Sequence, residues 1–334
     1  MSGSEERWGG AMRMIPGYPA LPGVLLLVIV WSLAGCGRGG YRPADVVIPD
    51  AHGGGSALAV MPDSTRLASG GWSGEIRIWR LPEGTPVRRW QGHQGEVTGL
   101  AFLDRDRLLS GGYDGRLVLW SLAGKMRRRT PSGVPVTAMA VTGSRVLTGH
   151  ADGTLRLWSL PGLTSPSLLG RHQGAVRAVA FSSDGRLMAS SGTDGRVRLW
   201  QSQGEAITLQ APGSDARTLA FAPDRGALYG AGWFDLYRWD LATGRLATID
   251  TDHRGIINSI RFDPRGRYLA TISRQTDSSV LFLDPASGRT LARFQPHALC
   301  GGRVVVSPDG RTLVTTSDDA SIMIWSLDRG PVVR

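Results

Sequence analysis

A short segment that ends in Trp, usually apolar-x-apolar-Trp, recurs along this chain and constrains its fold more than any other feature. The recurring anchors are Trp79, Trp120, Trp158, Trp200, Trp239 and Trp325, and Leu283 ends a seventh copy. Consecutive copies lie between 38 and 44 residues apart. A period near 40 residues is typical of a β-propeller, in which each repeat folds as four short strands. The sequence therefore predicts an all-β fold: a single seven-bladed β-propeller of four-stranded antiparallel blades.

Each repeat has the same internal order, which the fourth repeat shows most clearly. An apolar segment, 176–181, leads into the turn Ser183-Asp184-Gly185, and a second apolar segment, 187–190, follows it. The turn Thr193-Asp194-Gly195 then precedes the segment that ends in Trp200. Asp and Gly accept the backbone angles of tight turns, so this order predicts consecutive hairpins.

A polar set recurs with the Trp: a His before the first segment, a Ser or Thr in the second, and an Asp six residues before the Trp. Three repeats hold the full set: His93, Ser110, Asp114 and Trp120; His172, Ser190, Asp194 and Trp200; and His297, Thr315, Asp319 and Trp325. This pattern resembles the WD-repeat family. The resemblance implies that each set is a hydrogen-bonded tetrad that holds its blade together.

The other four repeats depart from the set. The first has His52, Ser69 and Trp79, with Ser73 at the Asp position, and the third has Thr148, Asp152 and Trp158 without the His. The fifth has Tyr229 and Trp233 at the Ser and Asp positions. The sixth has His253, Ser273 and Asp277 but ends in Leu283. We expect the fifth repeat to be the least regular blade.

Closure of the ring has two candidate solutions. The seventh blade needs a fourth strand, and either Asp45-Val46-Val47-Ile48-Pro49 or Pro331-Val332-Val333-Arg334 could supply it. We favour the N-terminal segment, because a blade made from both ends of the chain pins both termini.

The N-terminal segment reads as a targeting signal. The apolar run that begins at Val24 covers about 12 residues, whereas roughly 20 are needed to cross a bilayer. It follows Arg7 and Arg13 and ends in Leu33-Ala34-Gly35-Cys36, which resembles the lipobox of bacterial lipoproteins, where the cysteine is acylated. We predict a signal peptide over 1–35, a lipidated Cys36 that opens a flexible tether over 36–43, and the propeller over 44–334. The expected location is the cell envelope, at the periplasmic face of the outer membrane.

The recurring Ser, His and Asp resemble a hydrolase triad, but the same set recurs at fixed spacing, whereas an active site is needed once. The chain has no G-x-S-x-G, Cys-x-x-Cys or His-x-x-x-His motif. We therefore expect no enzymatic activity, no cofactor and no metal.

The resemblance places the ligand on the narrow face of the propeller, around the central channel. The candidate contact residues there are Trp72, Glu96, Thr98, Tyr113, Arg177, Asp215, Arg217, Asn258 and Asp318, with Thr193, Ile256 and Cys300 beside them. Trp72 and Tyr113 could form one aromatic patch, whereas Trp233 and Phe234 are expected to pack.

The favoured function is a lipid-anchored, non-enzymatic scaffold that holds a partner protein or peptide. The net charge of +10 favours acidic partners. An envelope enzyme or redox accessory that binds a cofactor or polysaccharide, and a cytoplasmic WD-repeat regulator, stay open as alternatives. We expect a monomeric propeller. We also expect no nucleic-acid partner, because the run Arg127-Arg128-Arg129 falls on an outer edge, where basic residues discourage aggregation.

Overall fold

The computed structural model describes residues 40–131, 133–201 and 206–328, all within one compact unit, Gly39–Arg334. Over these residues the secondary structure consists of strands and turns, and no helix there is long and apolar enough to cross a membrane. The predicted signal peptide over 1–35, Cys36 and the first part of the tether lie outside the described residues.

The strands form seven antiparallel sheets of four strands each. The first three blades comprise β2 (Gly55–Val60), β3 (Arg66–Gly71), β4 (Glu75–Arg80) and β5 (Pro86–Gln91); β6 (Val97–Phe102), β7 (Arg107–Gly112), β8 (Arg116–Ser121) and β9 (Met126–Pro131); and β10 (Val136–Thr142), β11 (Arg145–His150), β12 (Thr154–Ser159) and β13 (Ser167–Arg171). The next three comprise β14 (Val176–Phe181), β15 (Leu187–Gly192), β16 (Val197–Gln201) and β17 (Ile207–Thr208); β18 (Thr218–Phe221), β19 (Ala227–Ala231), β20 (Leu236–Asp240) and β21 (Leu246–Ile249); and β22 (Ile256–Phe262), β23 (Leu269–Arg274), β24 (Val280–Leu283) and β25 (Thr290–Phe294).

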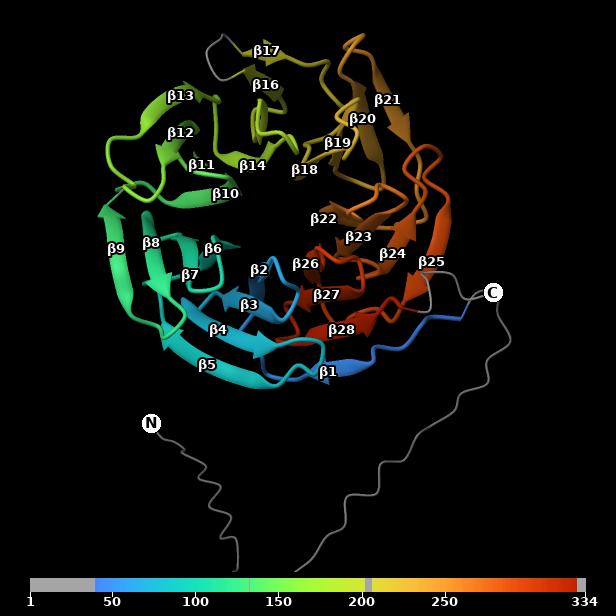
Figure 1. The fold of residues 1–334 in the computed structure, drawn as a ribbon. Helices are drawn as coiled ribbons and strands as arrows, with labels where there is room; N and C mark the ends of the chain where they lie inside the picture. The colour runs from blue at the N-terminus through green and yellow to red at the C-terminus, as the bar shows by residue number, and fades with distance from the viewer. Residues whose placement is uncertain (1–39, 132, 202–205, 329–334) are drawn as a thin grey trace, which may run out of the picture. The chain divides into compact units, whose positions relative to one another are not determined.

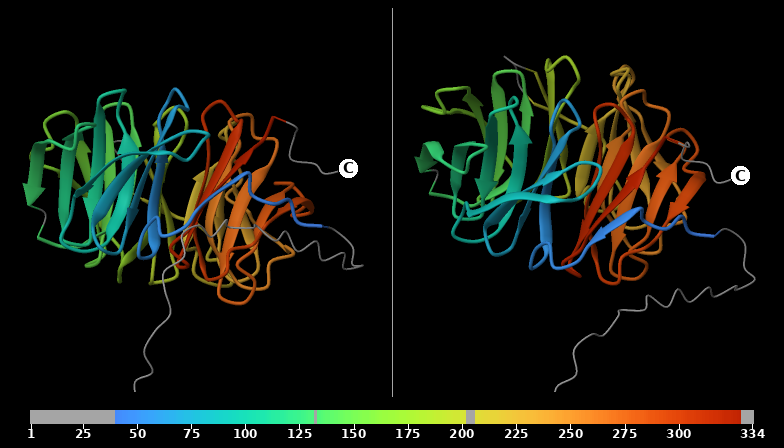
Figure 2. Two further views of the ribbon diagram at one scale, coloured as in Figure 1. Left: turned by 90° about the horizontal axis from the view of Figure 1, so that it is seen from below. Right: turned by 60° about the horizontal axis from the view of Figure 1, so that its bottom comes forward.

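The seventh blade joins the two ends of the propeller. It consists of β26 (Gly301–Val306), β27 (Thr312–Ser317), β28 (Ile322–Ser326) and the N-terminal strand β1 (Val46–Ile48). Figure 1 shows the blades arranged in a ring, with the first strand of each blade at the centre and the fourth at the rim, and Figure 2 shows the ring from the side. The predicted seven-bladed propeller is confirmed.

The N-terminal segment provides the closing strand. β1 pairs antiparallel with β28, with Val46 opposite Ile324 and Ile48 opposite Ile322. Val46 and Ile48 pack into the cluster of apolar side chains between blades seven and one. The preference for the N-terminal strand is therefore confirmed, and the competing segment 331–334 lies outside the described residues.

Seven clusters of buried apolar side chains fill the ring, one at each interface between neighbouring blades. Each recurring Trp packs into the interface with the preceding blade; Trp120, for example, lies with Ala68 and Ile78 of blade one. Leu283 occupies this position between blades five and six, where Tyr229 of blade five adds its ring. The rings of Tyr229 and Phe262 meet edge-on with their centroids 5.1 Å apart, and the Tyr229 hydroxyl donates a hydrogen bond to the Pro285 carbonyl at 3.2 Å. A tyrosine from the fifth blade thus fills space beside the Leu that replaces Trp in the sixth.

Hydrogen bonds join the polar set within blades two and four. In blade two, the Trp120 indole N–H donates to Ser110 Oγ at 2.8 Å, and Ser110 Oγ lies 2.6 Å from His93 Nε2. His93 Nδ1 lies 2.9 Å from Asp114 Oδ1. A carboxylate can only accept, so Nδ1 carries the proton and Nε2 accepts from the Ser hydroxyl. Blade four repeats the arrangement, with Ser190 between Trp200 at 2.9 Å and His172 at 2.8 Å, and Asp194 2.9 Å from His172.

Blade three takes its imidazole from His150, a histidine that the repeat pattern did not assign to the set. His150 ends β11, is fully buried, and lies 2.9 Å from Thr148 Oγ1 through Nε2. Trp158 donates to the same hydroxyl at 2.9 Å. A His two residues after the Thr, rather than one before the first strand, therefore supplies the imidazole.

In blade six the hydroxyl partner of His253 is Thr271, at 2.7 Å, rather than the predicted Ser273. Thr271 pairs with Leu281, as Ser110 pairs with Val118 in blade two, but the turn after β23 is two residues longer. Counting back ten residues from Leu283 therefore lands on the wrong hydroxyl. Ser273 instead contacts Asp277 and Ser279.

The fifth blade is irregular for the opposite reason, because its turn is one residue shorter. Gly230, not Tyr229, occupies the register position of the Ser: it pairs with Tyr237, two residues before Trp239. A Cβ on Gly230 would lie 2.9 Å from the Trp239 ring, so the indole occupies the space of the missing side chain. The Trp239 N–H donates to the Gln210 carbonyl at 2.9 Å instead.

The seventh set is joined less completely than predicted. His297 Nε2 lies 2.7 Å from Thr315 Oγ1, and its Nδ1 lies 3.3 Å from Asp319 and 3.0 Å from Ser321 Oγ. The Trp325 indole donates to the backbone oxygen of Arg42 at 3.3 Å, in the segment that leads into β1. A backbone carbonyl of the closing segment therefore replaces the Thr315 hydroxyl as the acceptor of the indole N–H.

The closing strand generates a stability prediction. Replacing Ile48 with Asp places a charge in the apolar cluster between blades seven and one, so we expect the free energy of unfolding to fall by about 2 kcal/mol or more in urea denaturation. Val47→Asp is the matched control, because Val47 is 47% exposed on the same strand. Equal losses for the two variants would contradict the assignment of β1 as a packed strand.

The first blade predicts a pH dependence. Burial, and then Arg77, lower the pKa of His52 from 6.5 to about 4. The unfolded chain binds a proton at higher pH than the folded chain, so stability should fall as pH drops from about 6.5 to about 4. The buried Nδ1 of His52 lacks a hydrogen-bond partner among the described residues, because Ser73 stands where other blades have Asp.

Ser73→Asp should restore that partner and raise the free energy of unfolding by about 1 kcal/mol at pH 7. It should also make the loss between pH 6.5 and 4 smaller, because a carboxylate favours protonated His52. Urea denaturation across this range measures both effects. Ser167→Asp on the exposed strand β13 is the control, and an equal gain there would count against the repair.

Candidate functional site

The first strand of a blade begins at the mouth of the central channel, and an irregularity near its start turns one side chain toward that mouth. Register shifts occur at this point in every blade except the fifth. A bulge inserts an extra residue and re-aims its side chain. The residues at or beside the bulges include Thr98, Thr137, Arg177, Asn258 and Arg303, and Arg217 directly precedes the regular strand β18.

Some of these side chains tie neighbouring blades together. Thr98 of blade two donates to the Val136 carbonyl of blade three at 2.8 Å, and the Asn258 amide of blade six donates to the Gly302 carbonyl of blade seven at 2.7 Å. Thr316 closes the ring in the same way with the Gly55 carbonyl, at 3.1 Å. The mouth is therefore a rim cross-linked by hydrogen bonds.

A cavity of about 240 Å³ occupies the mouth. Its lining includes six of the residues that the sequence analysis selected: Trp72, Glu96, Arg177, Arg217, Asn258 and Asp318. These residues come from six different blades. The structure thus brings together side chains that lie up to 246 positions apart in the chain.

The remaining selected residues surround this cavity. Thr98 lines the narrower constriction of about 70 Å³ below it. Tyr113 is 52% exposed outside the cavity lining, and its backbone N–H donates to the Glu96 carbonyl at 2.8 Å. Asp215 is half-buried, and its charge partly opposes the lowering of the pKa of Arg217. Thr193 and Cys300 hold the rim through backbone hydrogen bonds to Ala175 and Asp318.

Trp72 is both packed and accessible. A Cβ on Gly54 would lie 2.6 Å from the indole, so the ring covers the Gly54 backbone, yet Trp72 is 53% exposed. Among the ring contacts of the described residues, Trp72 has none with Tyr113. Trp233 and Phe234, expected to pack, are 42% and 45% exposed and contact each other at 5.6 Å.

Comparison with known families supports the same architecture. The profile of the family described as WD domain, G-beta repeat matches residues 46–80, 84–121, 128–159, 164–201, 244–282 and 288–326. These matches cover more than half of the chain. The chain belongs to the WD-repeat family. Most of the fifth blade lies outside the matches, as its missing hydroxyl and shortened turn would lead one to expect.

Three curated proteins illustrate how this WD-repeat chain relates to others. It is 26% identical to Protein HIR1 of Candida albicans over 80% of this chain and 22% of that protein. It is 29% identical to apoptotic protease-activating factor 1 of Rattus norvegicus, over 49% of this chain and 13% of that protein. It is 27% identical to the target of rapamycin complex subunit wat1 of Schizosaccharomyces pombe, over 47% of this chain and 52% of that protein. The matched region spans about half or less of each relative.

Two arginines of this WD-repeat mouth, Arg303 and Arg274, were not predicted from the repeat pattern. Arg303 lies at the bulge of blade seven, as Arg177 does in blade four, but it follows His297 by six positions, whereas Arg177 follows His172 by five. Arg274 ends β23, beside the lengthened turn of blade six, and pairs with Asp318 at 2.9 Å. Aligning the blades from their bulges rather than from their His residues would have found Arg303.

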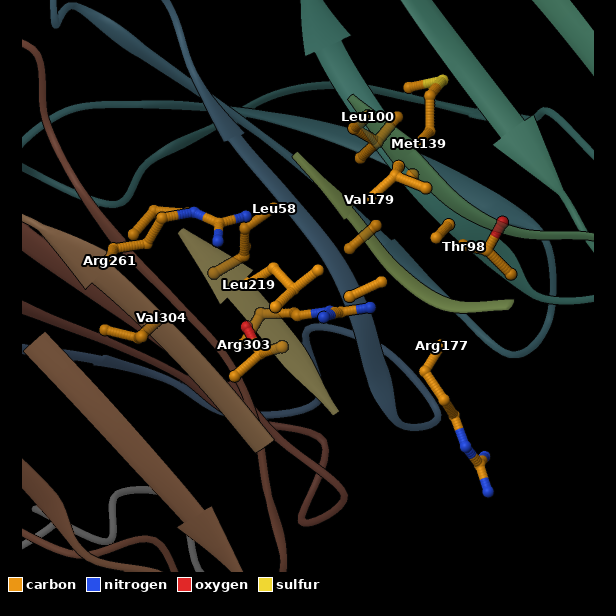
Figure 3. Close-up of a pocket in the computed structure, with 16 residues that line it drawn as sticks. Leu58, Thr98, Leu100, Met139, Arg177, Val179, Leu219, Arg261, Arg303 and Val304 are labelled. Carbon is orange, nitrogen blue, oxygen red and sulfur yellow. The ribbon is translucent and has the colours of Figure 1, made fainter. Parts of the chain in front are cut away.

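The positive charges of neighbouring arginines help to lower the pKa of Arg217, Arg303 and Arg261. Burial, and then Arg177, lower the pKa of Arg217. Burial also lowers the pKa of Arg303, where Glu96 opposes the shift and Arg274 adds to it. Arg261 lies deeper in the channel wall, and the surrounding protein, and then Arg303, lower its pKa to about 10, although the residue is exposed in part to the channel. Figure 3 shows Arg177, Arg261 and Arg303 around the constriction.

Below the constriction the lining of the WD-repeat channel contains fewer charged side chains, with Arg261 among them. The channel widens to about 610 Å³, and its wall consists mainly of aliphatic and Phe side chains such as Val60, Phe102, Val141 and Phe181. Most of the charged side chains of the channel are therefore concentrated at one end, where the first strands begin.

Proposed function

We propose that this WD-repeat propeller is a non-catalytic binding platform that holds a partner protein or peptide on its narrow face, the face at which the first strands begin. The observation that carries the proposal is the cavity at the channel mouth. Six blades contribute side chains to it, including an accessible Trp and several Arg. Trp and Arg are the residue types most enriched among the contacts that dominate binding energy.

The Ser, His and Asp groups support a structural role over catalysis. Ser110 and His93 are 0% and 2% exposed, so a substrate cannot reach them in this conformation. The Ser110 hydroxyl is already occupied by Trp120 and His93. These groups satisfy one another in the interior, as buried polar groups must.

The names of two relatives describe subunits of multi-protein assemblies: the target of rapamycin complex subunit wat1 and the transcription initiation factor TFIID subunit 5 of Caenorhabditis elegans. By analogy, we propose protein partners for this chain. The analogy concerns the class of partner and not its identity.

We further propose that lipid on Cys36 anchors the platform at a bacterial cell envelope. The support is the segment Leu33-Ala34-Gly35-Cys36 at the end of an apolar run, followed by Gly37-Arg38-Gly39-Gly40 as a tether. Several acyl chains would make such an anchor stable. On this proposal the propeller faces the periplasm, where a partner can reach the channel mouth.

A capture experiment tests the platform. The tagged full chain is expressed in its native host, cross-linked and purified from detergent-solubilised membranes, and the co-purifying proteins are quantified. We expect Trp72→Ala to reduce capture of the main partner by about tenfold, because an exposed Trp at a contact centre is worth about 2 kcal/mol. Leu168→Ala is the control, since Leu168 is 68% exposed on the outer strand β13. Equal capture by wild type and Trp72→Ala, or loss with Leu168→Ala alone, would contradict the proposal.

Metabolic labelling with radioactive palmitate tests the anchor. The wild-type chain should incorporate label, Cys36→Ser should not, and globomycin should cause the unprocessed form to accumulate. Cys300→Ser is the control and should label normally. Absence of label from the wild type would refute the lipid anchor while leaving the platform untouched.

A further inference from the structure

The channel mouth carries more positive charge than its own acidic groups can balance. Four guanidinium groups line the cavity, from Arg177, Arg217, Arg274 and Arg303, against two carboxylates, from Glu96 and Asp318. Asp318 pairs with Arg274 at 2.9 Å. The charge of the other carboxylate, Glu96, favours protonated Arg303.

Arg177 and Arg217 are the cations left over. Within the described residues, neither side chain forms an ion pair with a carboxylate. The charge of Asp215 favours protonated Arg217, but the positive charge of Arg177 opposes it more strongly. Arg217 is half-buried and Arg177 is exposed at the same cavity. Like charges near each other repel, and an anion between them would relieve the repulsion.

The position of the pair in the fold accounts for its orientation. Arg177 lies at the bulge of β14, and Arg217 directly precedes β18 in the next blade, so the two guanidinium groups approach the cavity from adjacent blades. A guanidinium presents a planar fork of donors that fits a carboxylate in a bidentate manner. Two such forks that line one cavity suit two carboxylates on one short segment.

The size and surroundings of the cavity restrict the ligand. At about 240 Å³, it is smaller than the sites that enclose a drug-sized molecule, and residues of six blades surround it. A duplex or a bilayer surface cannot enter it, whereas one or two side chains can. Trp72 lines the same cavity and offers a flat apolar surface to the adjoining peptide.

We propose that Arg177 and Arg217 form an anion subsite at the mouth of the channel, which receives paired carboxylates from an acidic segment of the partner protein. This inference rests on the proposed platform function and specifies the chemistry of its ligand. Arg303 and Arg261 continue the positive potential into the channel below the subsite.

Calorimetric titration of the full chain in detergent tests the subsite. The probe is a blocked peptide with four consecutive glutamates, and the reference is its all-glutamine counterpart. We expect the glutamate peptide to bind, the glutamine peptide not to bind, and the double variant Arg177→Gln/Arg217→Gln to weaken binding by about tenfold or more.

The matched control is Arg127→Gln/Arg129→Gln, which removes the same charge from exposed positions on the outer strand β9. It should leave binding within about twofold of the wild type, because separated surface charges are screened. Equal weakening by the two double variants would show attraction by net charge alone and would overturn the subsite. Failure of the glutamate peptide to bind would overturn it as well.

Thermal denaturation of the unliganded variants gives a second readout. Removing Arg177 and Arg217 relieves repulsion, so the double variant should melt at or above the wild-type temperature. Melting below it would mean that the arginines serve the fold, which overturns the proposal. Inorganic phosphate, titrated in parallel, should compete with the peptide; phosphate binding without peptide binding would reassign the site to a free anion.

The two proposals fail in different ways. If the glutamate peptide does not bind but capture of the partner still depends on Trp72, the anion subsite is wrong and the platform stands. If capture does not depend on Trp72, the platform itself is wrong.

Discussion

A buried hydroxyl shared between an indole and an imidazole organises this propeller. In blade two, Ser110 accepts from Trp120 and donates to His93, whose other nitrogen donates to Asp114. The Trp belongs to the third strand, the Ser to the second and the His to the loop before the first, so one chain of hydrogen bonds fixes the loop and two strands. Burial lowers the pKa of His93, which favours the neutral imidazole that this direction of donation requires. The same ring of Trp120 fills the interface with blade one, which couples the interior of one blade to its neighbour.

Blades that lack part of this set compensate through their neighbours. Blade three draws its imidazole from His150, at the end of its own second strand. Blade six has no Trp, and Tyr229 from blade five fills part of the interface beside Leu283. Blade seven gives its indole hydrogen bond to the segment leading into β1, the strand that closes the ring. The propeller tolerates these departures because each interface has to be filled and each buried donor satisfied, but no single residue type has to do either.

The period of the Trp anchors was sufficient to predict the number of blades and their strand order, since turn chemistry and apolar patterning agree in most repeats. The residue assignments failed where turn length changed. Two extra residues after β23 moved the hydroxyl from Ser273 to Thr271, and one missing residue in blade five moved the position from Tyr229 to Gly230. The same cause hid Arg303, because the loop into blade seven is one residue longer than the loop into blade four. Pairing register, which determines these positions, depends on contacts that spacing alone does not specify.

The channel mouth differs from the rest of the ring because some of its charged groups have no ion-pair partner among the described residues. Thr98 and Asn258 bind neighbouring blades, whereas Arg177 and Arg217 face a cavity without ion-pair partners among the described residues. Site-specific photo-cross-linking tests directly whether a partner sits there. A benzophenone amino acid in place of Tyr113, at the rim of the mouth, should cross-link to the partner in cells, and the same group in place of Leu168, on the outer strand β13, should not. Cross-links from the Leu168 position with none from the Tyr113 position would contradict the account.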